Sequence, residues 1–497
     1  MERSDRVFVA PESAGDKVEN GDYASFRARL GSLPAVSEQW FPPPPSELEL
    51  QSRWHAGEFG RCFQSTRGQR VEIVEFGAWN RGAGPDFHGA VIRIGSELHH
   101  GDVELDPAAR DWERHGHLEN PAFDGVVLHV FLEHHAGGTW FTRTSRNREV
   151  CQVKLDLQQL VGGAPAPTPP EVHAGLCAPV FAGLSDEAAG ALLQSAAQFR
   201  MRQRMERLSR VERVHGADQA LFLCLGEALG YRRNRIPMRV LAQELPLQML
   251  RGLDEVEAEA ALFGRAGFLE GLRHLETDDP AKRAWQRRLW SAWWKDCGAL
   301  RDARTALRWS TAGVRPLNHP QRRLGALCAL VRVWDELRGV IDARPFDQKR
   351  IHQILTGLSH PFWNIHYSLH AEPSPKPLAL LGGDRILDIL ANCVFPRILS
   401  KSPQEWPAYL RLRGGTVSEP VRRAALRFFG SDAARRRRFT SFLHTQQALL
   451  QLDRDVCLAG REGCGACDFP ERLADWAQAL RLRWAEHEHS GRNDSGG

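Results

Sequence analysis

Apolar and polar positions follow different periods in the two parts of the chain. Between about Ser46 and Leu160 the hydrophobic runs are short and mostly alternate with polar residues, a pattern typical of β-strands interrupted by short helices. Ser46 is the predicted N-cap of the first helix. Six elements are predicted in the order α-β-β-β-α-β: a helix at 46–57, strands at 70–77, 85–95 and 97–106, a helix at 107–117 and a strand at 125–134.

Beyond a segment rich in Gly, Ala and Pro, the hydrophobic period becomes helical almost to the end of the chain. The first helix, at 184–214, is long and amphipathic, with Ser185 as its predicted N-cap. Further helices are predicted at 217–230, 237–250, 254–274, 280–300, 321–340, 384–399, 419–429 and 437–456. The pattern therefore predicts an α+β protein in which an α/β domain precedes a mainly helical domain.

Proline-rich and glycine-rich stretches divide the chain further. Four prolines at 42–45 end a polar N-terminal stretch, and the closing residues are small and polar. The expected organisation is a flexible segment at 1–45, an α/β domain at 46–160, a linker at 161–183, a helical domain at 184–456, a Cys-rich clamp with a helix at 457–485, and a disordered tail at 486–497.

The 497 residues have the composition of an ordinary globular protein, with 42% hydrophobic and 25% charged residues. This composition excludes a collagen-like or mainly disordered chain. No uncharged apolar run is long enough for a membrane-spanning helix, and the charged N-terminus lacks the apolar centre of a signal peptide. We therefore expect a cytoplasmic protein without a membrane partner. The net charge of +4 does not by itself indicate nucleic acid, and the sequence does not specify an oligomeric state.

Acidic residues lie at neighbouring ends of two predicted strands. Asp86 stands at the start of the second strand, and Glu104 stands near the end of the third. Adjacent strands are about 5 Å apart, so these two carboxylates can share a divalent cation such as Mg²⁺ or Mn²⁺. Asp106 alternates onto the same face as Glu104. A further metal-binding carboxylate could come from Glu72 or Glu75 on the preceding strand.

This arrangement resembles the PD-(D/E)xK nuclease superfamily, whose restriction-endonuclease-like core has the same α-β-β-β-α-β order. The resemblance implies that Asp86 and Glu104 bind Mg²⁺ or Mn²⁺ for phosphodiester hydrolysis in DNA or RNA. Asp106 stands where the superfamily has a Lys that assists the attacking water, and it is a third candidate catalytic residue. Lys154 could supply a migrated Lys.

A wider resemblance covers the chain from about 46 to 470. The runs GAWNRGAGPDFHGAVIRIG, GDVELD, DWERHGH and FDGVVLHV, together with later segments such as ALGYRRNRIPMRVLA, are similar to the bacterial domain-of-unknown-function family numbered 2851. The family is uncharacterised, so the resemblance implies no activity. Asp106 stands where the family pattern has His, which argues against residue 106 as a required catalytic base.

Histidines are concentrated around the acidic pair. Seven of the twenty lie within thirty-seven residues: His99, His100, His115, His117, His129, His134 and His135. His117, close after Asp111 and Trp112, and His129, on the next strand, are predicted metal ligands, because neutral imidazoles bind Zn²⁺ or Mn²⁺. The alternative is that these histidines are surface or core residues without a ligand.

The cysteines Cys457, Cys464 and Cys467 form a cluster with x6 and x2 spacing. Thiolates at such spacing bind Zn²⁺ or an iron–sulfur cluster. The spacing is similar to that of the first three cluster ligands in endonuclease III-like glycosylases, and some PD-(D/E)xK nucleases combine one distant Cys with three C-terminal ones. Cys177 is the first candidate for a fourth ligand, and Cys393 is the second. Three free reduced thiols are the alternative.

Three functions remain open from the sequence. The first is a metal-dependent nuclease, the second is a catalytically inactive nucleic-acid-binding or scaffold protein that has lost the Lys, and the third is a His-rich metal site acting on an unrelated substrate. The distance of the nearest Lys or Arg from Asp86 and Glu104 distinguishes an active nuclease from an inactive protein. The number of imidazoles around these carboxylates distinguishes the His-rich metal site from both. Arg-rich runs at 232–235 and 435–438 are compatible with phosphate binding or with a solvated surface.

Overall fold

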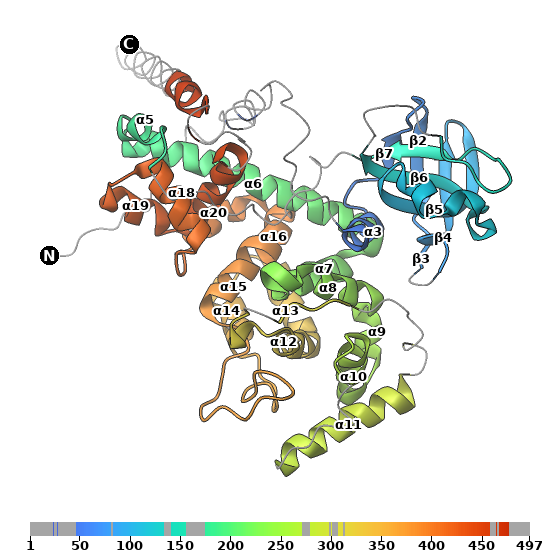
Figure 1. Cartoon of the computed structure of the whole chain (residues 1–497). Coiled ribbons are helices and arrows are strands. Elements are labelled where there is room, and N and C mark those ends of the chain that lie inside the picture. Colours follow the sequence, from blue (N-terminus) through green and yellow to red (C-terminus); the bar gives the residue numbers. More distant parts are fainter. Residues whose placement is uncertain are drawn as a thin grey trace. The chain divides into compact units, whose positions relative to one another are not determined.

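The computed structural model describes residues 23, 27, 46–80, 83–133, 141–155, 174–270, 279–297, 300, 307–311, 314–457, 464 and 467–476. In these parts a seven-stranded sheet precedes a large helical region, so the predicted α+β class is confirmed (Figure 1). Except for Tyr23 and Arg27, the segment expected to be flexible at 1–45 lies outside the described residues. The expected tail at 486–497 and most of the expected linker lie outside them too.

The sheet forms at the predicted positions and gains three short strands. Its strands are β1 (Cys62–Gln64), β2 (Arg70–Glu75), β3 (Ala78–Trp79), β4 (Phe87–Ile94), β5 (Glu97–Ala108), β6 (Val126–Glu133) and β7 (Cys151–Lys154). Their order is β1-β2-β4-β5-β6-β7, with β3 paired to β4. The pairs from β1 to β5 are antiparallel, whereas β6 is parallel to both β5 and β7. The unpredicted strands β1, β3 and β7 are too short to show a period of two.

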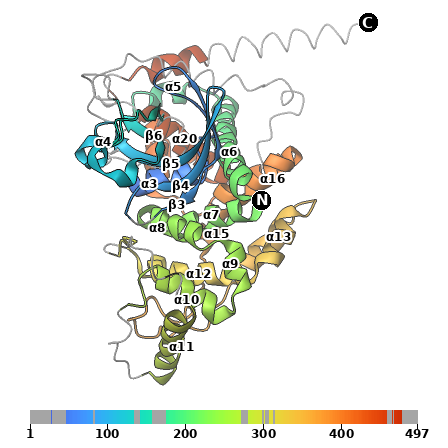
Figure 2. The same ribbon diagram turned by 90° about the vertical axis from the view of Figure 1, so that its right-hand side faces the viewer.

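The first and last strands of the sheet meet. Ser65, directly after β1, forms an antiparallel bridge with Val153 of β7. The N–H of Thr66 donates to the carbonyl of Gln152 over 2.9 Å. The sheet is therefore curled, and helix α3 (Glu47–His55) packs against it. Figure 2 shows α3 beside β4 and β5.

The two faces of β5 have different surroundings. Val103 and Leu105 point into the apolar core that α3 shares with the sheet. The alternate residues Glu104 and Asp106 are also buried, but they point to the opposite face. That face is covered by α4 (Asp111–Arg114) and the turn that follows it, so two acids are enclosed without facing the main core.

The predicted helix at 107–117 is shorter in the structure. Strand β5 continues to Ala108, and α4 is a single turn followed by a 3₁₀ turn at His117–Glu119. The carboxylate of Asp111 accepts the N–H of Ala108 over 3.0 Å and starts the helix where the strand ends. Gly116 ends it with a left-handed φ of 75°.

The helical region contains most of the predicted helices, several of them divided. Its helices are α5 (Ala178–Ala182), α6 (Asp186–His215), α7 (Ala217–Leu229), α8 (Tyr231–Glu244), α9 (Leu247–Gly252), α10 (Glu255–Arg265), α11 (Pro280–Asp296), α12 (Pro320–Arg332), α13 (Trp334–Asp342), α14 (Gln348–Thr356), α15 (Gly383–Ile389), α16 (Phe395–Lys401), α17 (Trp406–Leu410), α18 (Glu419–Phe429), α19 (Ala433–Thr440) and α20 (Leu443–Leu452). Pro246 separates α8 from α9, because proline cannot donate within a helix. Within the described residues no helix is both long and apolar enough to span a bilayer.

The chain forms two compact units, each built from segments that are distant in sequence. One contains 1–42, 165–205 and 398–497, and the other contains 43–164 and 206–397. The second unit therefore joins the sheet to α7 through α15.

A buried ionic cluster connects the sheet region to the helices of the second unit. Glu58, after α3, contacts the guanidinium groups of Arg53 at 3.1 Å and Arg207 at 3.0 Å, and it also pairs with Arg239 of α8. Glu227 of α7 pairs with Arg207 and Arg239 as well. Burial alone would raise the pKa of Glu58, but the guanidinium groups of Arg207, Arg239 and Arg53 lower it to about 2. The cluster fixes α3, which in turn positions one side of the site described next.

Candidate metal centre

Two buried carboxylates of β5 form the floor of the candidate site. Glu104 lies in register with His129 of the parallel strand β6, and Asp106 lies in register with Phe131. The side chain of Asp106 is 1% exposed. A carboxylate so enclosed requires a compensating charge or hydrogen-bond donor, and the surrounding histidines supply donors of this kind.

The segment after β5 places two imidazoles over these carboxylates. Trp112 of α4 anchors the segment, since its ring is buried and its Nε1 donates to the carbonyl of Arg143 over 2.9 Å. His115 and His117 flank Gly116, whose left-handed backbone directs both rings back to β5. Three contacts result: His115 Nδ1 lies 3.2 Å from Asp106 Oδ1, and His117 Nε2 lies 3.2 Å from Glu104 Oε1 and stacks on Phe123.

A third imidazole holds Asp106 from the opposite side. His129 Nε2 lies 3.2 Å from Asp106 Oδ2, and its Nδ1 lies 2.5 Å from Thr142 Oγ1. Gln152 Nε2 donates to the same Thr142 oxygen over 2.8 Å. The Thr142 hydroxyl is then available to donate to His129 Nδ1, which leaves the Nε2 proton of a neutral His129 for Asp106. This chain orients the carboxylate as the outer partners of metal ligands do.

Asp106, His115 and His117 have the geometry of a metal-binding group. One donor atom from each lies within 4.8 Å of the others. Asp106 Oδ1 and His117 Nε2 are buried, and each has an ionic neighbour at 3.2 Å but forms no well-aligned hydrogen bond among the described residues. One carboxylate oxygen and two imidazole nitrogens form a donor set that suits Zn²⁺, Mn²⁺ or Fe²⁺. These residues therefore fit a bound transition-metal ion.

Asp86 and Glu104 are held beside this group through the main chain. The N–H of Asp86 donates to Glu104 Oε2 over 3.0 Å, and the N–H of Leu105 donates to Asp86 Oδ2 over 2.9 Å. Gln51 of α3 donates to Asp86 Oδ1 over 2.6 Å and to Glu47 Oε1 over 3.0 Å. The two carboxylates predicted to be neighbours therefore lie side by side, each engaged by a backbone N–H.

The accumulated negative charge changes the proton affinity of the site. Burial, followed by the charge of Asp106, raises the pKa of Glu104 to about 9. Burial and the charge of Glu104 raise the pKa of Asp86 well above its usual value, and burial with Asp106 raises that of Glu47. Burial lowers the pKa of His117. A divalent cation would allow these acids to ionise together, because it supplies the missing positive charge.

Comparison with known families assigns the chain to a group. The sequence model of the family described as "Protein of unknown function (DUF2851)" matches residues 47–407, which include the whole sheet and the histidine–carboxylate group. The chain belongs to the DUF2851 family. No curated protein and no solved structure gives a significant match. The resemblance to the PD-(D/E)xK superfamily is not confirmed by these comparisons and stays a prediction.

The structure of this DUF2851 protein brings together most of the residues predicted to form the site. Asp86, Glu104, Asp106, His117 and His129 meet around the second half of β5. His115 completes the group, although the sequence did not single it out as a ligand. The sequence signal for His115 as a ligand was the His-x-His spacing that it forms with His117 after Trp112. Glu47 and Gln51 were not predicted, because only the fold brings α3 to β4.

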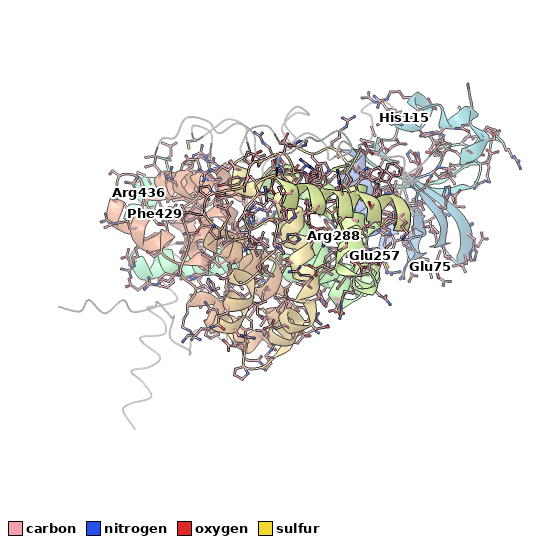
Figure 3. The ribbon with its side chains drawn as sticks, turned by 90° about the horizontal axis from the view of Figure 1, so that it is seen from below. Glu75, His115, Glu257, Arg288, Phe429 and Arg436 are labelled. Atoms are coloured by element: carbon pink, nitrogen blue, oxygen red, sulfur yellow. The ribbon has the colours of Figure 1, made fainter. Side chains whose placement is uncertain are left out.

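The β2 carboxylates do not reach this site. Glu72 lies in register with Cys62 on one side and Arg93 on the other, and its carboxylate is 3.7 Å from the Arg93 guanidinium. Figure 3 shows Glu75 and His115 at separate places of the sheet region. Lys154 ends β7 and is exposed, and its register through Phe131 places it level with Asp106, two strands away.

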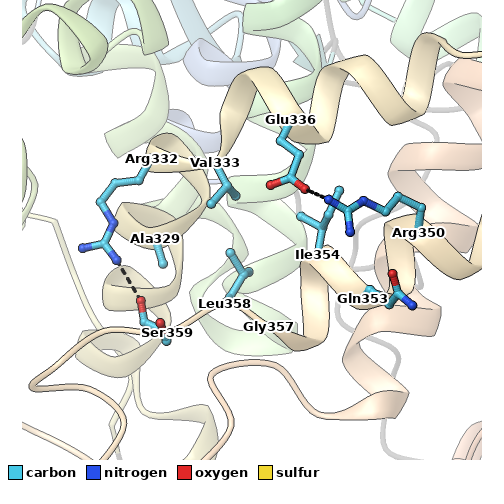
Figure 4. Close-up of a pocket in the computed structure, with 10 residues that line it drawn as sticks. All are labelled: Ala329, Arg332, Val333, Glu336, Arg350, Gln353, Ile354, Gly357, Leu358 and Ser359. Atoms are coloured by element: carbon cyan, nitrogen blue, oxygen red, sulfur yellow. Dashed lines mark hydrogen bonds and ion pairs between the residues drawn. The ribbon is translucent and has the colours of Figure 1, made fainter.

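A pocket of about 260 Å³ lies away from this group, between α12, α13 and α14 (Figure 4). Arg332 closes one side by donating to the carbonyl of Ser359 over 2.9 Å, and Glu336 pairs with Arg350 on the other. None of the predicted site residues lines it. Its ionic groups are already paired, so it suggests no catalytic chemistry.

Four of the five candidate thiol ligands lie in the other compact unit. Cys177, Cys457 and Cys467 contact one apolar cluster, and the N–H of Cys467 donates to the carbonyl of Cys464 over 3.3 Å. Cys393, the other candidate, is buried in the second unit, where its thiol pairs with that of Cys224. Cys177 is therefore the candidate that lies beside the C-terminal cysteines.

Proposed function

We propose that the sheet region of this DUF2851 protein is a metal-dependent hydrolase that cleaves phosphodiester bonds of nucleic acid. The observation that carries the proposal is the convergence of Asp106, His115 and His117 next to Glu104. Perturbed carboxylic acids beside a set of metal-binding donors are characteristic of hydrolytic sites.

The donor set favours Mn²⁺ or Zn²⁺ over Mg²⁺. Imidazole nitrogen is a good ligand for both of the former ions, whereas Mg²⁺ prefers a complete shell of oxygen ligands. Asp106, His115 and His117 would hold the ion, and His129 would keep Asp106 in position through its 3.2 Å contact. Glu104 Oε1, 3.2 Å from His117 Nε2, would stand beside the ion.

The chain's own groups supply the proton transfer. A bound divalent cation contributes a Lewis acid that stabilises negative charge on a substrate oxygen. Glu104 holds its proton in the metal-free chain, where its pKa is raised to about 9. Once a cation allows it to ionise, its carboxylate accepts the proton of the attacking water and then delivers that proton to the leaving oxygen. Asp86 and Gln51 hold Glu104 and its strand in place through the contacts at 3.0, 2.9 and 2.6 Å.

Two features favour a phosphodiester as the substrate. The antiparallel strands β2, β4 and β5, followed by α4 and the parallel strand β6, are compatible with the order that the PD-(D/E)xK resemblance implies, in which Asp86 and Glu104 would be the metal-binding acids. Lys154 is exposed and shares the face of Asp106, and its backbone lies two strands, or about 10 Å, from that of Asp106. It can bind a phosphate next to the one that is cleaved.

A second candidate is the same centre acting on an unrelated small substrate. The three imidazoles around Glu104 and Asp106 favour this alternative, and so does the lack of any Lys or Arg contact to Asp86 or Glu104 among the described residues. It shares the ligands and the proton-transfer group with the first candidate. Only the substrate distinguishes the two.

The experiment uses chelator-treated full-length protein reloaded with Mn²⁺, Zn²⁺ or Mg²⁺. We expect about one ion per chain by elemental analysis, and cleavage of labelled DNA or RNA with Mn²⁺ or Zn²⁺. Glu104→Gln should retain the fold and lose cleavage, whereas His100→Ala, which changes an exposed imidazole on the same strand, should behave as wild type.

Metal binding with hydrolysis of simple esters or amides but of no nucleic acid would favour the second candidate. Binding of nucleic acid without cleavage in any metal would contradict the hydrolase proposal and leave an inactive binding protein.

A further inference from the structure

Four cysteines from two distant segments gather in the compact unit that does not contain the sheet. Cys177 directly precedes α5, Cys457 ends the π-helical turn Asp453–Cys457 after α20, and Cys464 and Cys467 follow it. All four are free thiols. Cys177 lies within the residues that match the family, whereas the other three cysteines lie beyond them, and the group is independent of the hydrolase proposal.

The C-terminal end of α18 connects these thiols. The carbonyl of Arg427 accepts the Gly175 N–H over 2.9 Å and lies 3.6 Å from Cys177 Sγ. The guanidinium of the same Arg427 lies 3.7 Å from the carboxylate of Asp453, which begins the turn that ends at Cys457. Arg427 therefore links the two segments that carry Cys177 and Cys457, although 280 positions separate these cysteines in the sequence.

The four sulfurs are also close enough to influence one another. Burial raises the pKa of Cys177 well above its usual value, and the thiols of Cys457, Cys464 and Cys467 raise it further. Burial, followed by the charge of Asp453, raises the pKa of Cys457 to about 12, and Cys464 contributes to the same effect. Thiols in such surroundings become thiolates only when a cation holds them.

The spacing of the sulfurs argues against a single zinc ion. A tetrahedral zinc site with bonds of about 2.3 Å brings its sulfurs to about 3.8 Å from one another. Among the described residues, which include all four cysteines, only Asp106, His115 and His117 present three such donors within 4.8 Å. No three of the four sulfurs are therefore as close together as the ligands of one zinc ion.

We propose that Cys177, Cys457, Cys464 and Cys467 bind an iron–sulfur cluster that joins the start of α5 to the C-terminal part of the chain. Three features of the surroundings fit such a cluster. Phe181, Phe428 and Phe469 provide an apolar wall next to Cys177. Arg427, a buried guanidinium, offsets the negative charge of a cluster with four thiolates. Cys464 is exposed, which leaves one edge open for cluster insertion.

The test is anaerobic purification of the full-length protein, with measurement of iron, acid-labile sulfide and visible absorbance. We expect a brown protein with about four iron and four sulfide per chain. The content of acid-labile sulfide distinguishes a cluster at the cysteines from an ion bound at Asp106, because a single metal ion brings no sulfide. Colourless protein without sulfide after anaerobic reconstitution with iron and sulfide would overturn the proposal, and so would stoichiometric zinc on the four thiols.

Matched cysteine variants locate the cluster. Cys464→Ser removes an exposed ligand that contributes no apolar contact, so the fold should survive while the iron and sulfide content falls by more than half. Cys62→Ser removes an exposed thiol of β1 and should leave both contents unchanged. Equal loss in both variants, or retention of the full cluster by Cys464→Ser and by Cys467→Ser, would assign the cluster to other residues and contradict the proposal.

Discussion

Asp86 donates its backbone N–H to the carboxylate of Glu104 over 3.0 Å, across the pair formed by β4 and β5. The Asp86 carboxylate accepts the N–H of Leu105 in return, next to Glu104 in the chain. The two acids therefore hold each other's backbone, and Glu104 Oε1 remains directed at His117. The position of the Glu104 carboxylate therefore depends on the backbone N–H of Asp86, directly before β4.

Two substitutions of Asp86 distinguish the effect of its charge from the effect of its hydrogen bond to Leu105. Asp86→Asn keeps one oxygen that accepts from Leu105 but replaces the oxygen that accepts from Gln51, so it should lower the stability less than Asp86→Ala does. Asp86→Ala leaves a buried N–H without a partner and should lower the free energy of unfolding by about 1–3 kcal/mol. Urea denaturation measures both. Equal destabilisation by the two substitutions would show that the hydrogen bond is unimportant.

The raised pKa of Glu104 predicts a pH dependence of stability. The group titrates at about 9 in the folded chain and near 4.3 when unfolded, so the native state binds the additional proton between these values. The free energy of unfolding of metal-free protein should therefore fall as pH rises from about 5 to 9. Glu104→Gln should flatten this slope. Denaturation at pH 5, 7 and 9 checks the sign, and a stability that increases with pH over this range would contradict the raised pKa of Glu104.

The same protons compete with metal binding. Mn²⁺ requires ionised carboxylates, so the increase in melting temperature that Mn²⁺ causes should be larger at pH 8 than at pH 6. Thermal denaturation with and without Mn²⁺ at both pH values measures it. His117→Ala should abolish the increase, whereas His100→Ala should keep it. An increase of the same size at both pH values would indicate that the ion binds elsewhere.

Thr142 tests the chain that orients Asp106. Thr142→Val removes the oxygen that bridges Gln152 and His129, and it should weaken metal binding about 10- to 100-fold. Thr142→Ser keeps the oxygen and should restore the affinity. Calorimetric titration with Zn²⁺ or Mn²⁺ provides the measurement. If the Val and Ser variants bind equally well, His129 is held by packing against Trp112 instead.

The buried cluster around Glu58 predicts a stability effect of a different kind. Glu58→Gln leaves the guanidinium groups of Arg53, Arg207 and Arg239 without their shared anion and should cost about 3–5 kcal/mol. Glu149→Gln, which breaks an exposed pair with Arg67, should cost less than about 1 kcal/mol. Because the pKa of Glu58 is lowered to about 2, its contribution is present above pH 4.5 and is lost as pH falls toward 2. Acid denaturation of Glu58→Gln and Glu149→Gln measures how much each substitution changes the stability as the pH falls.

Local sequence patterns predicted the elements whose residues interact mainly with their neighbours in the chain. The alternation at 85–95 and 97–106 placed β4 and β5 correctly, since these strands form a hairpin. The long helix α6 was confirmed for the same reason, and Ser185 Oγ accepts the N–H of Ala188 over 3.2 Å as expected for its cap. The sequence could place Asp86 and Glu104 near each other because the two strands of a hairpin are adjacent.

Long-range contacts could not be predicted in this way. Strand β7 has only four residues, and its place at the sheet depends on pairing with β6 and on the bridge to Ser65. Glu72 was a reasonable third carboxylate by alternation, but its register opposite Arg93 directs it elsewhere. His115 joins the site through the left-handed turn at Gly116, which the sequence permits but does not require.

The division of the chain into interleaved segments has a consequence for biosynthesis. The segment at 165–205 leaves the ribosome before 206–397 and has to wait for 398–497 to complete its unit. At roughly 5–20 residues per second, this delay lasts from about a quarter of a minute to about a minute. During this time Phe181 and Leu192 lack their apolar partners, and Cys177 is an unprotected thiol. Release of nascent chains truncated before 398 should therefore give products that depend on holding chaperones, whereas the sheet and its helices are already complete.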